Sequence, residues 1–142
     1  MVNKWLKRAA VAMTATSAVI AVPTPASASV DGCVPAQGGT GKHFGDICLK
    51  IVGGGNNVQY MQAYGTGAIN PFHIQLYGPE GVVGNTVTTA PGEWNTLQAE
   101  YNRYVAGGNW CARLWSHTES GIEDWGTQCW TVWSPDPERR AV

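Results

Sequence analysis

Two tryptophan-rich segments, each centred on a cysteine, limit what this chain can fold into. They span residues 109–115 and 125–133 and flank a short polar stretch. If Cys111 pairs with Cys129, the midpoint falls at residue 120, in the turn-forming pair Ser120-Gly121. The pattern therefore predicts an antiparallel hairpin closed by a disulfide.

The register of this hairpin divides its side chains between two faces, because neighbouring side chains on a strand alternate. The cysteine face would carry Arg113, Trp115, Trp125, Thr127, Thr131 and Trp133, and the other face Trp110, Ala112, Leu114, Trp130 and Val132. The second set is almost wholly apolar, so we expect it in the core, with Trp110 opposite Trp130. Two alternatives stay open. Another segment covers the cysteine face, or a one-residue bulge exchanges the two faces.

The remaining segments have the alternation and the glycine and proline punctuation of strands, without a helical period. Strands are predicted at 47–52, 58–64, 72–77, 82–89 and 94–105, with 29–42 extended. About seven short strands with turns at this spacing favour an all-β fold. We expect a small antiparallel β-sandwich, immunoglobulin-like or similar, with two disulfides.

The amino-terminal residues have the organisation of a secretory signal peptide. Lys4, Lys7 and Arg8 precede an uncharged run over 9–22, and Ala26-Ser27-Ala28 supplies small residues for cleavage after Ala28. The expected organisation is a signal peptide over 1–28, one sandwich domain over 29–134 and a flexible tail over 135–142. We expect a secreted, extracellular protein without a membrane anchor after cleavage.

All four cysteines follow this signal, where an oxidising environment favours pairing. Three connectivities exist, and the most economical joins Cys33 to Cys48 and Cys111 to Cys129. A zinc site is the competing interpretation. It is disfavoured because no Cys-x-x-Cys pair is present and the histidines at 43, 73 and 117 are not spaced as ligands. We therefore expect no metal and no cofactor.

Charge argues against nucleic acid as a partner. Three of the nine basic residues lie in the signal, so the mature chain keeps six against ten acidic residues, a net charge of about −4. The basic residues are also scattered, apart from the pair Arg139-Arg140.

No catalytic residues are predicted. Glu119, Glu123 and Asp124 cluster at the expected hairpin tip, where solvated charges are usual. Ser116 and His117 are adjacent, so a strand would point their side chains apart, and no Gly-x-Ser-x-Gly motif is present.

The predicted function is binding, with an extracellular glycan or cell-wall polymer as the leading ligand. The candidate site consists of Trp115, Trp125 and Trp133 with Arg113 beside them, because rigid rings stack on sugars while polar groups hydrogen-bond hydroxyls. The competing interpretation is that these tryptophans serve packing alone.

The pattern from Trp110-Cys111-Ala112-Arg113-Leu114-Trp115 to Cys129-Trp130-Thr131-Val132 resembles small secreted actinomycete proteins with two disulfides and no assigned activity. The resemblance implies export and a disulfide-bonded β fold, and it assigns no functional residues.

In size, export and cysteine number the chain also resembles the amylase-inhibitor and subtilisin-inhibitor families. It lacks the Trp-Arg-Tyr of the amylase inhibitors, and the nearest match is Asn102-Arg103-Tyr104. The alternative function is accordingly inhibition of an extracellular protease or amylase through a protruding loop at 65–71 or 117–124. The partner would then be an extracellular protein, and the sequence sets no oligomeric state.

Overall fold

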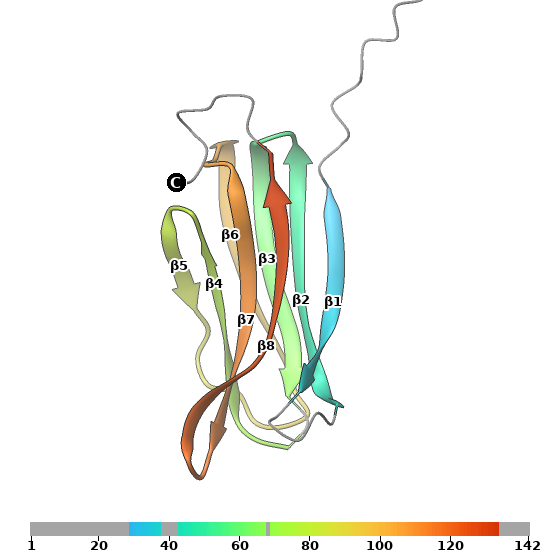
Figure 1. The fold of residues 1–142 in the computed structure, drawn as a ribbon, viewed down its shortest axis with the longest axis vertical. Coiled ribbons are helices and arrows are strands. Elements are labelled where there is room, and N and C mark those ends of the chain that lie inside the picture. The colour runs from blue at the N-terminus through green and yellow to red at the C-terminus, as the bar shows by residue number, and fades with distance from the viewer. Residues whose placement is uncertain (1–28, 38–42, 68, 134–142) are drawn as a thin grey trace, which may run out of the picture.

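Two antiparallel sheets lie face to face in the computed structural model, which describes residues 29–37, 43–67 and 69–133 (Figure 1). The first sheet has the order β1-β2-β3-β6 and the second the order β5-β4-β7-β8. The first consists of β1 (Val30–Gln37), β2 (His43–Gly54), β3 (Asn57–Gly67) and β6 (Trp94–Tyr104); the second of β4 (Phe72–Gly78), β5 (Gly81–Asn85), β7 (Gly108–Thr118) and β8 (Gly121–Val132). The predicted all-β sandwich is confirmed. The predicted signal peptide and tail lie outside the described residues.

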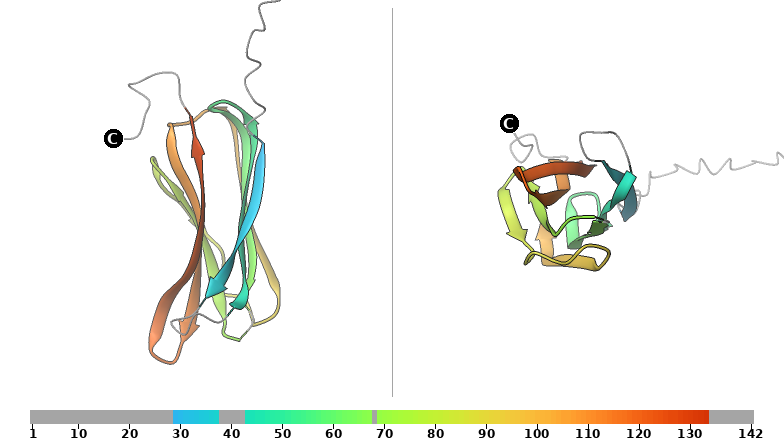
Figure 2. Two further views of the ribbon diagram at one scale, coloured as in Figure 1. Left: turned by 45° about the vertical axis from the view of Figure 1, so that its right-hand side comes forward. Right: turned by 90° about the horizontal axis from the view of Figure 1, so that it is seen from below.

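Alternation along the strands builds the core. In β4 the apolar residues Phe72, Ile74 and Leu76 are fully buried, whereas the residues between them face outward. The same period recurs in the strands packed opposite, and Figure 2 shows the two layers enclosing this shared interior. Within the described part of the chain, no helix has the length and apolarity needed to cross a membrane.

Both predicted disulfides are confirmed, and each joins neighbouring strands of one sheet. Cys33 on β1 pairs with Cys48 on β2, and Cys111 on β7 pairs with Cys129 on β8. Covalent bonds therefore fix the registers of two hairpins, one in each layer, and none of them links the layers.

Tryptophan side chains connect the two layers instead. Trp130 on β8 donates its indole N–H to the carbonyl of Leu49 on β2 at 2.9 Å. Its ring lies over Gly32 on β1, where an added Cβ would stand 2.8 Å from the indole. Trp110, opposite Trp130, is fully buried, and its ring centroid lies 5.7 Å from that of Tyr101 on β6 of the other sheet. Within its own sheet it leaves no room for a side chain at Gly78, where a Cβ would stand 2.3 Å from its ring. The predicted pairing of the two tryptophans on the inner face is confirmed, with Trp110 in the core and Trp130 half-buried against it, and each ring requires a glycine beside it.

One predicted strand is shorter than expected. Instead of extending over 82–89, β5 ends at Asn85. Thr86 and Thr89 lie in the connection that follows it. The hydroxyl of Thr86 accepts a hydrogen bond from the Ile74 backbone N–H at 2.9 Å, and the Asn95 side-chain amide donates to the same hydroxyl at 2.9 Å. Backbone hydrogen bonds to β4 continue at Thr86 and Thr89, but the Thr86 side chain takes the Ile74 N–H and so interrupts the regular ladder between them.

Candidate functional site

The predicted site is divided by a bulge in the β7–β8 hairpin. The register set by the disulfide holds from Cys111 and Cys129 as far as Leu114 and Gly126 and then shifts by one residue, so that Trp115 faces Asp124. Trp125 is the extra residue and turns inward, where it is 6% exposed and joins the core. Its expected place on the cysteine face is wrong, because the bulge exchanges the faces only on the tip side of the hairpin.

Trp133 is exposed but lies far from Trp115. Val132 pairs with Gly108, which places Trp133 about eight residues along the sheet from Trp115, or about 26 Å at roughly 3.3 Å per residue. Its side chain is 62% exposed. The three tryptophans of the predicted site therefore do not form one surface.

Trp115 and Arg113 do share the outer face, in a row that we call the arginine ladder, consisting of Tyr77, Arg113 and Trp115. The guanidinium carbon of Arg113 lies 4.7 Å from the Tyr77 ring centroid and 5.1 Å from that of Trp115. Arg113 also donates to the Tyr77 hydroxyl at 2.7 Å and to Thr127 Oγ1 at 3.3 Å, and its Nε lies 3.2 Å from the Asp124 carboxylate. This polar set is satisfied within the protein, which orders the ladder without a ligand.

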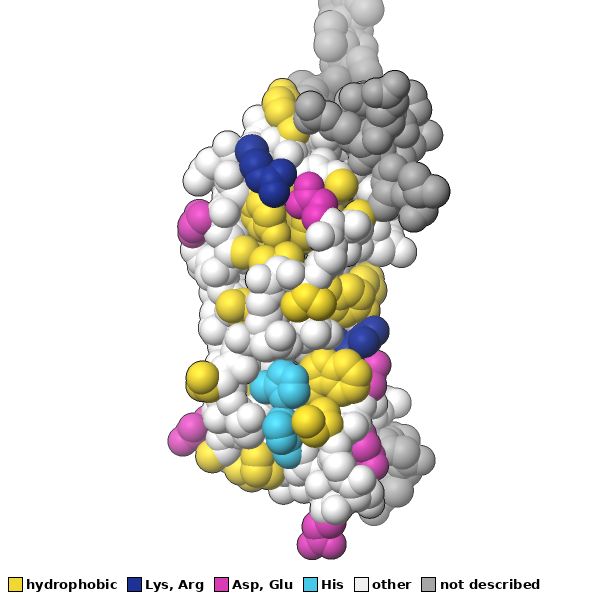
Figure 3. All heavy atoms as spheres, turned by 90° about the vertical axis from the view of Figure 1, so that its left-hand side faces the viewer, with side chains coloured by type: hydrophobic (Ala, Val, Ile, Leu, Met, Phe, Trp, Pro, Cys, Tyr) yellow, Lys and Arg dark blue, Asp and Glu magenta, His cyan; other side chains and the backbone are white. Residues whose placement is uncertain are grey.

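Two histidines extend this row beyond Trp115. His73 on β4 faces Trp115 across the strands, and the nearly parallel rings have centroids 6.4 Å apart. Nδ1 of His73 lies 2.7 Å from Nε2 of His117. Burial, reinforced by the neighbouring His117, lowers the pKa of His73. In Figure 3, which faces this side of the molecule, the described histidine side chains lie together beside hydrophobic ones.

Sequence reasoning missed this histidine pair, because 44 residues separate its members. The pair depends on β4 lying beside β7, although β5 and β6 intervene in the chain. No local pattern indicates that pairing, so the spacing of the histidines in the sequence carried no signal.

Glu123 and Asp124, two of the three carboxylates considered for catalysis, have structural partners. Glu123 accepts the indole N–H of Trp125 at 3.1 Å, and Asp124 accepts the backbone N–H of Gly126 at 3.0 Å in addition to its contact with Arg113. Ser116 is buried on the inner face and His117 lies on the outer one, so the two adjacent side chains point apart. The two carboxylates therefore hold groups at the bulge, and Ser116 belongs to the buried interior.

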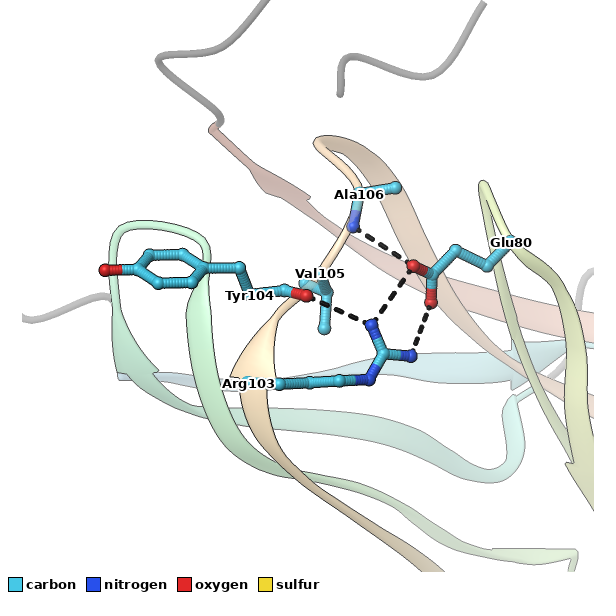
Figure 4. A pocket seen from close by; sticks show the side chains of 5 residues that line it. All are labelled: Glu80, Arg103, Tyr104, Val105 and Ala106. Carbon is cyan, nitrogen blue, oxygen red and sulfur yellow. Dashed lines mark hydrogen bonds and ion pairs between the residues drawn. The ribbon is translucent and has the colours of Figure 1, made fainter. Parts of the chain in front are cut away.

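A small pocket lies where the β4–β5 turn meets the end of β6 (Figure 4). Arg103 donates to both oxygens of Glu80, at 3.2 and 3.4 Å, and the backbone N–H of Ala106 donates to the same carboxylate at 3.4 Å. Both oxygens of Glu80 are therefore engaged, and they link the β4–β5 turn to the connection between β6 and β7.

The outward face of the first sheet carries a more open aromatic surface, which we call the Trp94–Tyr64 face. Trp94 on the edge strand β6 is 62% exposed, and its ring is tilted by 34° against that of Tyr64 on β3, with centroids 6.3 Å apart. The Tyr64 hydroxyl donates to Asp31 at 2.6 Å, which orders the ring and, as the main cause, raises the pKa of Tyr64 to about 12. Tyr64 is therefore a neutral phenol over the whole physiological range.

A line of polar side chains crosses the sheet beside these rings. Pairing places four residues in one line across the four strands and on the same face as Tyr64: Asp31, Lys50, Gln62 and Gln98. Amides both donate and accept. Gln98 already donates to Glu100, so the Gln98 oxygen and the Gln62 amide are the groups that offer hydrogen bonds beside the rings. Sequence reasoning missed this face because its members are distributed over four strands.

Comparison of the chain with protein-family models, with curated protein sequences and with solved structures finds no match. Functional inference therefore depends on the chemistry of these two outward faces.

Proposed function

We propose that this chain is a secreted, non-enzymatic domain that binds an extracellular glycan or cell-wall polymer on the Trp94–Tyr64 face. The carrying observation is the open ring pair of Trp94 and Tyr64 beside the amides of Gln62 and Gln98. The signal-like amino terminus supports secretion, and two disulfides in a small β protein are compatible with an extracellular location.

The chemistry of this face fits a neutral polymer of sugars. Aromatic rings supply rigid apolar area at low entropic cost, on which the C–H face of a sugar ring packs. Amide side chains supply donors and acceptors for hydroxyls. Because β3 and β6 are adjacent and each is 11 residues long, the face offers a strip suited to an extended chain.

The arginine ladder is the alternative location for the same function. It combines the rigid aromatic ring of Trp115 with the cation of Arg113, both of which belong to the site predicted from the sequence. However, Arg113 lies over the ring of Trp115, and the Trp115 indole N–H is engaged by Gln75 at 3.2 Å. A sugar would have to displace these contacts, so the Trp94–Tyr64 face is the stronger candidate.

The test is co-sedimentation of the purified protein with insoluble cellulose, chitin and peptidoglycan. Trp94→Ala is expected to weaken binding about tenfold or more, since stacking residues dominate such interfaces. Trp133→Ala is a matched control, because its side chain is also 62% exposed. If Trp115→Ala abolishes binding and Trp94→Ala leaves it unchanged, the site lies on the arginine ladder. If the wild-type protein binds none of the polymers, the proposal is refuted.

Inhibition of an extracellular hydrolase is the second candidate. The β7–β8 hairpin projects beyond the other strands (Figure 1), and Ile122 near its tip is 58% exposed. This inhibitor would insert Ile122 into an apolar pocket of the hydrolase. Mixing the protein with secreted proteases and amylases would then inhibit one of them stoichiometrically, and Ile122→Asp would abolish the inhibition.

A further inference from the structure

The imidazoles of His73 and His117 meet on the outer face of the second sheet. Nδ1 of His73 and Nε2 of His117 are 2.7 Å apart, and the ring planes are inclined at 74°. The residues come from β4 and β7, the two central strands of the sheet, where hydrogen bonding on both sides fixes the backbone. A pair held on rigid strands is preorganised for a ligand that engages both nitrogens.

We propose that His73 and His117 together bind one Cu²⁺ ion through these two nitrogens. Imidazole nitrogen is a preferred ligand of copper, nickel and zinc, and Cu²⁺ binds most strongly to a given nitrogen site. The proposal goes beyond glycan binding and does not depend on it, since it concerns a different sheet.

The separation of the nitrogens favours copper over zinc. With metal–nitrogen distances of about 2.0–2.1 Å, two ligands at right angles are about 2.9 Å apart, whereas two ligands at the tetrahedral angle are about 3.3 Å apart. The observed 2.7 Å is a hydrogen-bond distance, so reaching the first value takes a small increase in separation together with rotation of both rings, which turns their lone pairs from each other toward a common ion. A tetragonal ion such as Cu²⁺ has the right-angle arrangement.

Coordination changes the tautomer of one ring. In the neutral pair one of the two contact nitrogens carries a proton and donates the hydrogen bond, and the lone pair of the other accepts it. When Cu²⁺ binds, that proton moves to the opposite nitrogen of its own ring, and both contact nitrogens donate lone pairs to the metal. Among the described residues no cluster of three or more histidine, cysteine or acidic side chains is placed to hold a metal ion. Water therefore completes the coordination.

The surroundings of the pair provide a spectroscopic signal. The Trp115 indole is 6.4 Å from the His73 ring, well within the range at which paramagnetic Cu²⁺ quenches fluorescence. The nearby cation of the ladder is Arg113, and the Asp124 carboxylate, 3.2 Å from its Nε, offsets its positive charge. Electrostatic repulsion of an incoming cation is thereby reduced.

The experiment is calorimetric titration of the untagged protein with CuCl₂ and with ZnCl₂, together with electron paramagnetic resonance of the copper-loaded protein. Wild type is expected to bind one Cu²⁺ with hyperfine coupling to two nitrogens. His73→Asn and His117→Asn should each weaken this binding about tenfold or more, because the second imidazole acts as a tethered ligand. His43→Asn is the matched control, since His43 belongs to β2 of the other sheet.

Circular dichroism establishes that the variants are folded, and Trp115→Phe should remove most of the copper-dependent quenching. Copper binding that is unchanged in both His73→Asn and His117→Asn would overturn the proposal. So would coupling to a single nitrogen, or tighter binding of Zn²⁺ than of Cu²⁺.

Discussion

The indole of Trp125 packs against the ring of Phe44, with centroids 5.4 Å apart, on the inner side of β8. This contact joins the tip side of the β7–β8 hairpin to the start of β2 in the other sheet. It exists because a single extra residue in β8 turns Trp125 away from solvent. The bulge therefore converts a candidate ligand contact into a core contact.

Trp125→Ala is expected to lower the free energy of unfolding by about 3–5 kcal/mol, as for other large aromatic side chains removed from a core. Urea denaturation followed by circular dichroism measures the change. Trp133→Ala, on an exposed residue of the same type, should change stability by no more than about 0.5 kcal/mol. Equal effects of the two substitutions would contradict the inward orientation of Trp125.

Gly78→Ala is expected to destabilise the protein by about 1–3 kcal/mol, because the new methyl group would overlap the buried Trp110 ring. Trp110→Phe alone also destabilises, since it leaves a cavity. Combined with Gly78→Ala, it gives the methyl group room, so the double variant should be more stable than the sum of the single effects predicts. Strict additivity in thermal denaturation would show that Gly78 and Trp110 are not coupled.

Local patterns were sufficient to predict most of the strands and the sandwich class of this fold, but not the faces of its β7–β8 hairpin. Alternation over 72–77 identified β4, and the symmetric cysteines at 111 and 129 gave the β7–β8 register as far as the bulge. The bulge at Trp125 leaves no mark in the apolar pattern, because tryptophan is compatible with either face. Contacts between sequence-distant strands, such as His73 with His117, depend on the global strand order, which local sequence does not encode.

Removal of either disulfide should cost a similar free energy. The bonded cysteines are separated by 15 and 18 residues, and in the chain-entropy description loops of this size contribute about 3 kcal/mol each. The paired substitutions Cys33→Ala with Cys48→Ala, and Cys111→Ala with Cys129→Ala, are to be compared by urea denaturation. A much larger loss from one pair would reveal a contribution from native packing around that bond.

His73 should titrate below the usual histidine range in the metal-free protein, because burial and His117 disfavour its charged form. Nuclear magnetic resonance of the ring protons in the presence of a chelator measures this pKa. His117→Asn should move it upward.

The consequence for stability has a fixed sign. The unfolded state takes up a proton on His73 at a higher pH than the folded state does, so this residue contributes a loss of stability as pH falls through and below about 6.5. The loss should be smaller in His117→Asn. A His73 pKa above that of an unfolded peptide would reverse the sign and contradict the geometry.

Both disulfides lie within a sheet, and this arrangement shapes what survives when the sandwich opens. An oxidised chain that has lost its core still contains two closed loops whose cysteines hold β1 next to β2 and β7 next to β8. Its refolding search therefore starts with one strand pair of each layer already aligned. What remains to be found includes the long-range pairings of β3 with β6 and of β4 with β7 and the closure of one layer on the other, the steps that make such folds slow.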